Sequence, residues 1–119
     1  MAWIEIGSGL FASQPGDVEG PVRVVIGLKA IVEWMRESEG EPSIIVTNVA
    51  GGSAVSTIIR RAKAIVSTIG GPNSHIVVVA RDYNVPCIVG AGSLDPGALQ
   101  NGTRMRMRRD GTIEIDRPG

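Results

Sequence analysis

The fold of this chain is constrained most by three short apolar runs that recur about twenty residues apart. They are Ile44–Val46, Ala64–Val66 and Cys87–Val89. Between the first two runs, the segment Ser53–Lys63 carries apolar residues at helical spacing, so we predict a helix there. Its inward-facing side chains are predicted to be Val55, Ile58 and Ile59. Continuous apolar strands that alternate with helices are typical of parallel β-α-β units. We therefore expect an α/β fold with a parallel β-α-β-α-β core.

Further strands are expected on both sides of this core. The N-terminal stretch is rich in glycine and proline, and the short extended pieces predicted in it are Trp3–Ile6, Leu10–Ser13 and Val22–Ile26. Near the other end, Thr103–Arg108 alternates strictly between polar and apolar residues, as a half-buried strand does. The Asp110-Gly111 pair then predicts a hairpin into Thr112–Ile115.

A helix is predicted at Leu28–Glu37, ahead of the core. The residues at helical spacing that we expect to face inward are Leu28, Ile31, Val32 and Met35. Trp34 is expected to be a packing anchor on this helix and not a platform for a ligand. The stretch Ser38–Pro42 is predicted to end the helix, because it combines a helix stop with a proline.

The bulk composition excludes several classes of protein. The chain has 119 residues, which we interpret as one domain spanning residues 1–119, with 12 basic and 12 acidic residues. A net charge of zero provides no global field to attract nucleic acid or an anionic membrane. No apolar run is long enough to span a bilayer, and the N-terminus lacks the features of a signal peptide. We therefore expect a cytoplasmic protein.

Two residue types could suggest other functions. The single cysteine, Cys87, excludes an internal disulfide and a multi-cysteine metal site, and we expect it to be a small core residue. The predicted C-terminal hairpin contains the arginines Arg104, Arg106, Arg108 and Arg109. No aromatic residues lie between them to stack on bases, so a solvated strand face is favoured over a nucleic-acid site.

Two loops follow predicted parallel strands in a similar way. Val49–Ser53 and Ile69–Ser74 each contain a Gly-Gly pair followed by a serine that could cap the next helix. The carboxyl ends of parallel strands lie at one edge of a sheet, where open α/β sheets bind ligands. We therefore expect both loops at that edge.

The segment Ile76–Ala80 leaves two readings open. Its β-branched side chains favour a strand, whereas the residues around it favour a helix. Asn73 or Ser74 could cap a helix, Asn84 could stop it, and a proline follows at position 86. A hairpin strand and a buried helix are nearly tied by pattern alone. We predict a helix from about Ser74 to Tyr83.

His75 is the only histidine, and it would lie in the first turn of that helix. Backbone amides at a helix N-terminus can bind an anion, and the positive end of the helix dipole disfavours a protonated imidazole. Imidazole is mostly unprotonated near pH 7, so a ring nitrogen can act as a nucleophile. A histidine in this turn would therefore lie where a phosphoryl group is best held, although for an isolated histidine the alternative, a capping or loop histidine without chemistry, is favoured.

The stretch Ser67–Gly92 resembles the phosphohistidine signature of the phosphoenolpyruvate-utilising enzymes. The matching pairs are Gly70-Gly71, Ser74-His75, Ala80-Arg81 and Val85-Pro86. The resemblance implies a three-layer β/β/α swivelling domain, with extra strands at both ends, whose histidine takes phosphate at one active site and delivers it at another. The chain departs from the family where threonine usually stands two residues before the histidine, at Asn73. It also has Thr68 and Ile69 where acidic residues often precede the glycines.

The resemblance also implies a site and partners. His75 would be the catalytic residue, and phosphate-supporting roles are expected for Gly70, Gly71, Asn73, Ser74 and Arg81. For Arg81, a structural tie to a carboxylate such as Asp82 or Glu19 is an equally good reading. A chain this short cannot contain a TIM barrel or a nucleotide-binding domain as well. We therefore expect ATP and Mg²⁺ on partner domains, a second partner domain that binds pyruvate or phosphoenolpyruvate, and no cofactor or metal bound by this chain alone.

Three functions follow, in order of preference. The first is a phosphoryl carrier that relays phosphate between an ATP site and a pyruvate or phosphoenolpyruvate site of a phosphotransferase that is incomplete without its partners. A stand-alone subunit that works in trans is preferred, and one domain of a longer chain is the alternative. The second is a binding or regulatory module that keeps the swivelling fold without catalysis. The third, ranked low, is the small subunit of a dehydratase-type enzyme, which would give no reason for the Ser74-His75 pair.

Overall fold

The computed structural model describes residues 2–37, 42–49 and 54–117. Its elements in chain order are β1 (Trp3–Ser8), β2 (Leu10–Ser13), β3 (Val18–Val24), α1 (Gly27–Arg36), β4 (Ile44–Thr47), α2 (Ala54–Arg61), β5 (Ala64–Ser67), α3 (His75–Asp82), β6 (Cys87–Val89), the 3-10 helix η1 (Pro96–Ala98), β7 (Arg104–Met107) and β8 (Thr112–Asp116). The eight strands form one sheet in the order β1-β8-β7-β3-β4-β5-β6-β2. The predicted mixed α/β class is confirmed.

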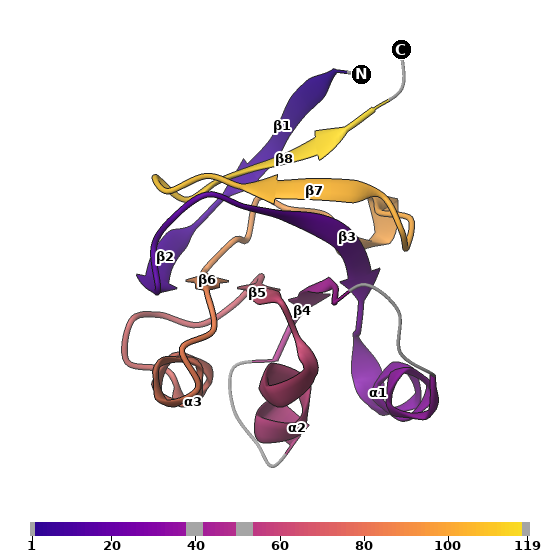
Figure 1. Ribbon diagram of the computed structural model, residues 1–119, viewed down its shortest axis with the longest axis vertical. Coiled ribbons are helices and arrows are strands. Elements are labelled where there is room, and N and C mark those ends of the chain that lie inside the picture. The colour runs from indigo at the N-terminus through magenta and orange to yellow at the C-terminus, as the bar shows by residue number, and fades with distance from the viewer. Residues whose placement is uncertain (1, 38–41, 50–53, 118–119) are drawn as a thin grey trace.

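The sheet is parallel in its middle and antiparallel on either side. β3, β4, β5 and β6 pair in parallel, and β2 joins the outer side of β6 in the opposite direction. The three α-helices cover one face of these strands, while β1, β7 and β8 lie across the other face (Figure 1). β3 belongs to both parts, because Val18–Pro21 pairs with β7 and Val22–Val24 pairs with β4.

Alternating side chains of the parallel strands supply two apolar cores. On β4, Ile45 packs towards the helices, whereas Ile44 and Val46 pack against the strands on the other face. Because side chains alternate along a strand, a strand buried on both faces has a nearly continuous run of apolar residues. This is why the three apolar runs in the sequence mark β4, β5 and β6 so clearly.

α2 buries the three side chains that the sequence predicted, and all three are fully buried. α1 differs from its prediction. Ile31 and Trp34 are buried, while Val32 and Met35 are exposed. Burying the indole removes more apolar surface from water than burying a methionine does, and the Arg61 guanidinium stacks over the Trp34 ring at 5.0 Å. Trp34 is thus confirmed as a packing anchor.

Parts of the α1 and loop predictions lie outside the described residues. They concern the side chain of Leu28, the helix stop at residues 38–41, and residues 50–53 of the first Gly-Gly loop with its capping serine. Outside the predicted core, β3 begins four residues before its predicted start, because Val18–Pro21 pairs with β7. The predicted C-terminal hairpin is confirmed as β7 and β8, which pair antiparallel.

The arginines of this hairpin are partly or fully exposed, in line with the predicted solvated face, and three of them also form ion pairs. Arg106 donates from Nε to Glu114 at 2.9 Å and stacks over the Trp3 ring at 4.2 Å. Arg104 pairs with Glu19 at 3.2 Å. The Arg106–Glu114 pair joins the two strands of the hairpin, while the contacts with Trp3 and Glu19 tie the hairpin to β1 and β3.

Candidate functional site

α3 forms where the helix was predicted, which settles the choice between helix and strand. Its side chains Ile76, Val77, Val79 and Ala80 are buried in the helix-side core. The lower helix propensity of β-branched residues is a small effect, and burial of this apolar face outweighs it. Asn84 adopts the left-handed conformation at φ +57° and ends the helix, as expected from its position before Pro86.

The loop between β5 and α3 lies against the loop that follows β6. The Gly90 amide donates to the Ile69 carbonyl at 3.2 Å, and the Ala91 amide donates to the Ser67 carbonyl at 3.1 Å. Gly70 has φ +94°, a backbone conformation that glycine adopts without strain. β4 contributes to the same edge, because the Thr68 amide donates to the Thr47 carbonyl at 3.0 Å. The carboxyl ends of three parallel strands are thus joined.

His75 is the first residue of α3, and its side chain is exposed. It therefore stands at the N-terminus of a helix whose apolar face is anchored in the core, directly after the Gly70-Gly71 loop. A side chain in this position can approach a second molecule without any movement of the core. This accessibility is the minimum requirement for a group that reacts at another protein's active site.

Ser74 occupies the N-cap position, but its predicted capping bond is absent. The hydroxyl donates to the Gly71 carbonyl at 2.7 Å, and no side-chain bond caps the helix. The serine is engaged by its own loop, which leaves no side chain to cover the first-turn amides. The Val77 amide already donates to the Ser74 carbonyl at 3.0 Å, whereas the amides of His75 and Ile76 precede it at the positive end of the helix. They can therefore serve an anion held at His75.

The other predicted site residues divide into two groups. Asn73 is exposed beside His75, and a Cβ at Gly71 would meet nothing within 4 Å. Arg81 lies six residues further along α3, a rise of about 9 Å from His75. Its Nε donates to the Ala12 carbonyl of β2 at 3.2 Å, whereas Glu19 pairs with Arg104. The structure therefore brings together the glycine loop, Asn73, Ser74 and His75, and places Arg81 at the other end of the helix.

Cys87 is buried in β6, as predicted for a core residue. Burial raises the pKa of its thiol to about 12, so the reactive thiolate is not available at neutral pH.

Two neighbours of the site were missed from the sequence, namely β2 and the loop Gly90–Gly92. The Gly90-Ala91-Gly92 pattern after an apolar run was the available signal for the loop. The position of β2 had no local signal, because its partner β6 lies far along the chain.

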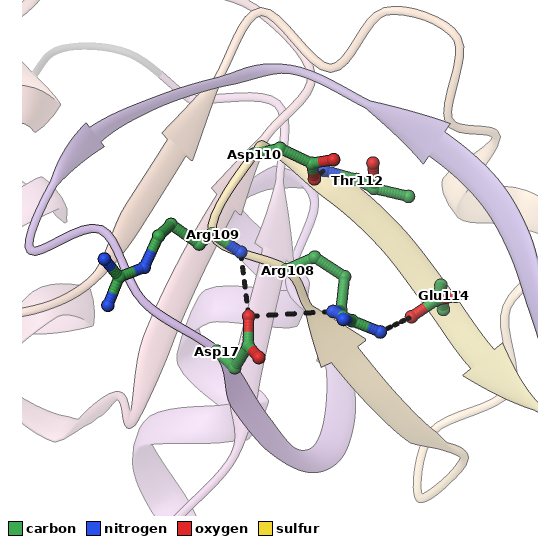
Figure 2. Close-up of a pocket in the computed structure, with 6 residues that line it drawn as sticks. All are labelled: Asp17, Arg108, Arg109, Asp110, Thr112 and Glu114. Atoms are coloured by element: carbon green, nitrogen blue, oxygen red, sulfur yellow. Dashed lines mark hydrogen bonds and ion pairs between the residues drawn. The ribbon is translucent and has the colours of Figure 1, made fainter.

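A charged cavity of about 570 Å³ lies elsewhere, between the loop before β3 and the turn from β7 to β8. Its lining residues are Asp17, Arg108, Arg109, Asp110, Thr112 and Glu114. Figure 2 shows Asp17 between the Arg109 amide, at 2.9 Å, and the Arg108 Nε, at 3.6 Å. Arg108 also pairs with Glu114 at 3.5 Å. None of the predicted site residues lines this cavity.

Within residues 2–37, 42–49 and 54–117, no cluster of three or more His, Cys, Asp or Glu side chains could hold a metal ion. In the same part of the chain, no helix has the length and apolar character needed to cross a membrane.

Residues 39–113 match the family model described as the PEP-utilising enzyme mobile domain. Among curated proteins, the chain is 32% identical over 114 residues to the pyruvate, phosphate dikinase of Rhizobium meliloti. This alignment covers 93% of the chain and 12% of that enzyme, so the chain spans about an eighth of the length of this relative.

Two solved structures share the fold. The aconitase X structure from Thermococcus kodakaraensis aligns with a TM-score of 0.66 at 17% identity, over 98% of this chain and 100% of that one. A solution structure of enzyme I aligns with a TM-score of 0.53 at 19% identity, over 66% of this chain and 32% of that one. At these identities the likeness shows the fold alone.

Proposed function

Because the chain belongs to the family of PEP-utilising enzyme mobile domains, we propose that it is a phosphoryl carrier that is transiently phosphorylated on His75. The observation that carries this proposal is the place of His75. Its exposed ring begins a helix with no side-chain cap, directly after a glycine loop at the carboxyl edge of the sheet. A histidine with a buried ring, or one followed by an extended segment in place of a helix, would be unable to exchange phosphate with a partner's active site.

The transfer step follows from the chemistry of imidazole. The ring nitrogen that lacks a proton attacks the phosphorus of the donor and forms an N–P bond. The P–O bond to the leaving group breaks, and its electron pair stays on the donor's oxygen. Phosphoryl transfer depends mostly on positioning and on charge stabilisation. The amides at the start of α3 can stabilise the phosphate oxygens, and the exposed side chain of His75 is open to the incoming group.

The donor and acceptor sites belong to partner domains in this proposal. ATP with Mg²⁺ would be held by one domain, and pyruvate or phosphoenolpyruvate by another, while this chain moves between them as the swivelling β/β/α unit that the sequence suggested. The size relation to the dikinase supports this division, because most of that enzyme lies outside the segment that the chain matches.

Two experiments test the carrier function. In the first, the full chain is incubated with phosphoenolpyruvate and intact R. meliloti pyruvate, phosphate dikinase, and phosphate on the chain is measured. We expect acid-labile, base-stable phosphate that is lost in His75→Ala and kept in Asp82→Ala, a control at an exposed position at the other end of α3. In the second, the chain replaces the 114 aligned residues of the dikinase. The chimera should be active with His75 and inactive with His75→Ala.

The alternatives from the sequence predict different results. A binding or regulatory module would take no phosphate in the first experiment and would give an inactive chimera in the second. The same holds for a small subunit of a dehydratase-type enzyme, to which the aconitase X likeness adds a shared fold only. Phosphate that persists in His75→Ala would also contradict the proposal.

A further inference from the structure

Three large apolar side chains on the elements around His75 are about half exposed. They are Leu10 at 49%, Ile69 at 49% and Val78 at 47%. We call these three residues the apolar rim. Each comes from a different element, namely β2, the loop after β5, and α3.

β2 places Leu10 beside the start of α3. β2 runs antiparallel to β6, with Leu10 opposite Val89, so Leu10 lies at the carboxyl edge of the parallel strands. Two residues later, Ala12 packs against the helix-side core and accepts the bond from Arg81 near the end of α3. Val89, the residue opposite Leu10, packs in the helix-side core, and paired residues of neighbouring strands share a face of the sheet, so Leu10 is on the helix side as well. β2 therefore runs alongside α3, with Leu10 nearer the end that bears His75.

Ile69 and Val78 complete the rim around the same point. The Ile69 carbonyl accepts the Gly90 amide, and Gly90 follows the residue opposite Leu10, so Leu10 and Ile69 flank Gly90. Val78 is three residues after His75, and residues at this spacing are neighbours on a helix surface. His75 and Val78 are both exposed on α3, whereas Ile76 and Val77 between them are buried.

The segments that build this edge contain no charged residue. Every one of the 24 charged side chains lies outside four stretches of the sequence, which are residues 6–16, 42–59, 64–80 and 83–94. The turn from β7 to β8, which reaches Gly9 beside β2, does carry charges. There Arg108 is paired with both Asp17 and Glu114, as Figure 2 shows. The segments that carry His75 and the apolar rim are thus uncharged, and a charged turn lies beside them at Gly9.

We infer that the apolar rim is the surface with which this domain docks onto the phosphoryl-donating domain of its partner, around the mouth of that domain's active site. The inference rests on the proposed carrier function. A neutral rim fits a neutral, apolar collar on the partner. A charged side chain in that collar would be buried by the rim without a counter-charge. The partner's cations then lie inside the collar, where they meet the phosphoryl group. In the dikinase, the large remainder of the chain provides the domains that such a rim would face.

The test uses the dikinase chimera with single substitutions in the rim, Leu10→Ser, Ile69→Ser and Val78→Ser. Each should lower dikinase activity by about tenfold, as loss of a central apolar contact does at an interface. The matched control is Met35→Ser on α1, where an apolar side chain is 47% exposed away from His75. It should change activity by less than about twofold, since isolated surface substitutions are mostly neutral.

A second measurement separates docking from the chemistry of His75. Phosphoramidate, a small donor that needs no docking surface, should phosphorylate the isolated rim variants within about twofold of the unchanged chain. Rim variants with full dikinase activity would overturn the docking inference and leave the carrier function standing. Equal losses with both donors would also overturn it, because the rim would then act on His75 itself. An inactive unchanged chimera, together with no transfer from intact dikinase, would overturn the carrier function and the docking inference with it.

Discussion

The amide of Gly9 donates to the carbonyl of Gly111 at 3.0 Å, at the point where the two ends of the sheet come together. β1 and β2 stand at opposite ends of the strand order, yet Gly9 is the only residue between them. With a single residue between β1 and β2, the backbone at Gly9 has to pass close to the backbones of Gly111 and Val89. A Cβ on Gly9 would lie 2.6 Å from the Val89 carbonyl oxygen, and a Cβ on Gly111 would collide with the Gly9 carbonyl oxygen.

Gly111→Ala should therefore destabilise the protein strongly. Gly111 has φ +94°, which strains a residue with a side chain, and the added methyl group would meet backbone atoms that cannot rotate away. Together these effects should lower the free energy of unfolding by about 3 kcal/mol. Urea unfolding followed by tryptophan fluorescence, from Trp3 and Trp34, measures the change. Gly16→Ala is the control, because a Cβ there would meet nothing within 4 Å. Equal urea midpoints of unfolding for Gly111→Ala and Gly16→Ala would show that the backbones of Gly9 and Gly111 are not in close contact.

The glycine pair before His75 gives a second prediction, because its two members differ. Gly70 has φ +94°, whereas Gly71 is outside the left-handed region and has open space around it. Gly70→Ala should lower the free energy of unfolding by about 1–2 kcal/mol, and Gly71→Ala by less than about 0.5 kcal/mol. The Gly70 variant should also take up less phosphate on His75, since the loop sets where α3 begins. Identical behaviour of the two variants would contradict this difference between the two positions.

Local patterns predicted most of the strands and helices of this fold. The strands β4, β5 and β6 are recognisable in the sequence as apolar runs because each is buried on both faces. The helix α2 is recognisable because its apolar residues form one stripe along the helix. The inward face of α1 was partly wrong, since apolar residues fill two adjacent stripes there. Only the fit of Trp34 between the core and Arg61 selects the stripe that is buried. Periodicity alone carries no information about such a fit.

The candidate site was predictable as a segment of chain but not as a surface. The glycine loop, the helix and the exposed position of His75 are local, and the structure has them as expected. The hydroxyl of Ser74 bonds to Gly71 and not to the helix amides, a choice between two short-range partners that the residue type does not decide. Leu10 reaches the site through pairing with Val89, which depends on the whole sheet.

The burial of Cys87 predicts a loss of stability at alkaline pH. Burial raises the pKa of the thiol from its usual 9.0 to about 12 in the folded protein. The folded state therefore favours the protonated thiol, and this contribution is fully present below pH 9 and is lost as the pH rises towards 12. Between pH 8 and 10 it should lower the free energy of unfolding by about 1.4 kcal/mol.

Cys87→Ala isolates that contribution, because alanine does not titrate. The variant should be less stable at pH 8 by about 1 kcal/mol, owing to lost packing. Its stability should then fall less between pH 8 and 10 than that of the unchanged chain. Urea unfolding at several pH values gives both numbers. Parallel pH profiles for the two proteins would mean that the thiol ionises as readily in the folded state as in the unfolded one.

Arg81 allows a structural role to be separated from a phosphate-supporting one. Its Nε bond to the Ala12 carbonyl ties the last turn of α3 to β2, the strand that also carries Leu10. Arg81→Ala should lower the free energy of unfolding by about 1 kcal/mol, the typical net contribution of one hydrogen bond. Phosphorylation of His75 by phosphoramidate should stay within about twofold, because the guanidinium points to the other end of the helix. Arg81→Lys keeps the charge but loses the planar Nε donor, so it should be destabilised like the alanine variant. If lysine instead preserved a phosphorylation rate that alanine abolished, the positive charge itself would be acting on the phosphate, and the bond to Ala12 would be secondary.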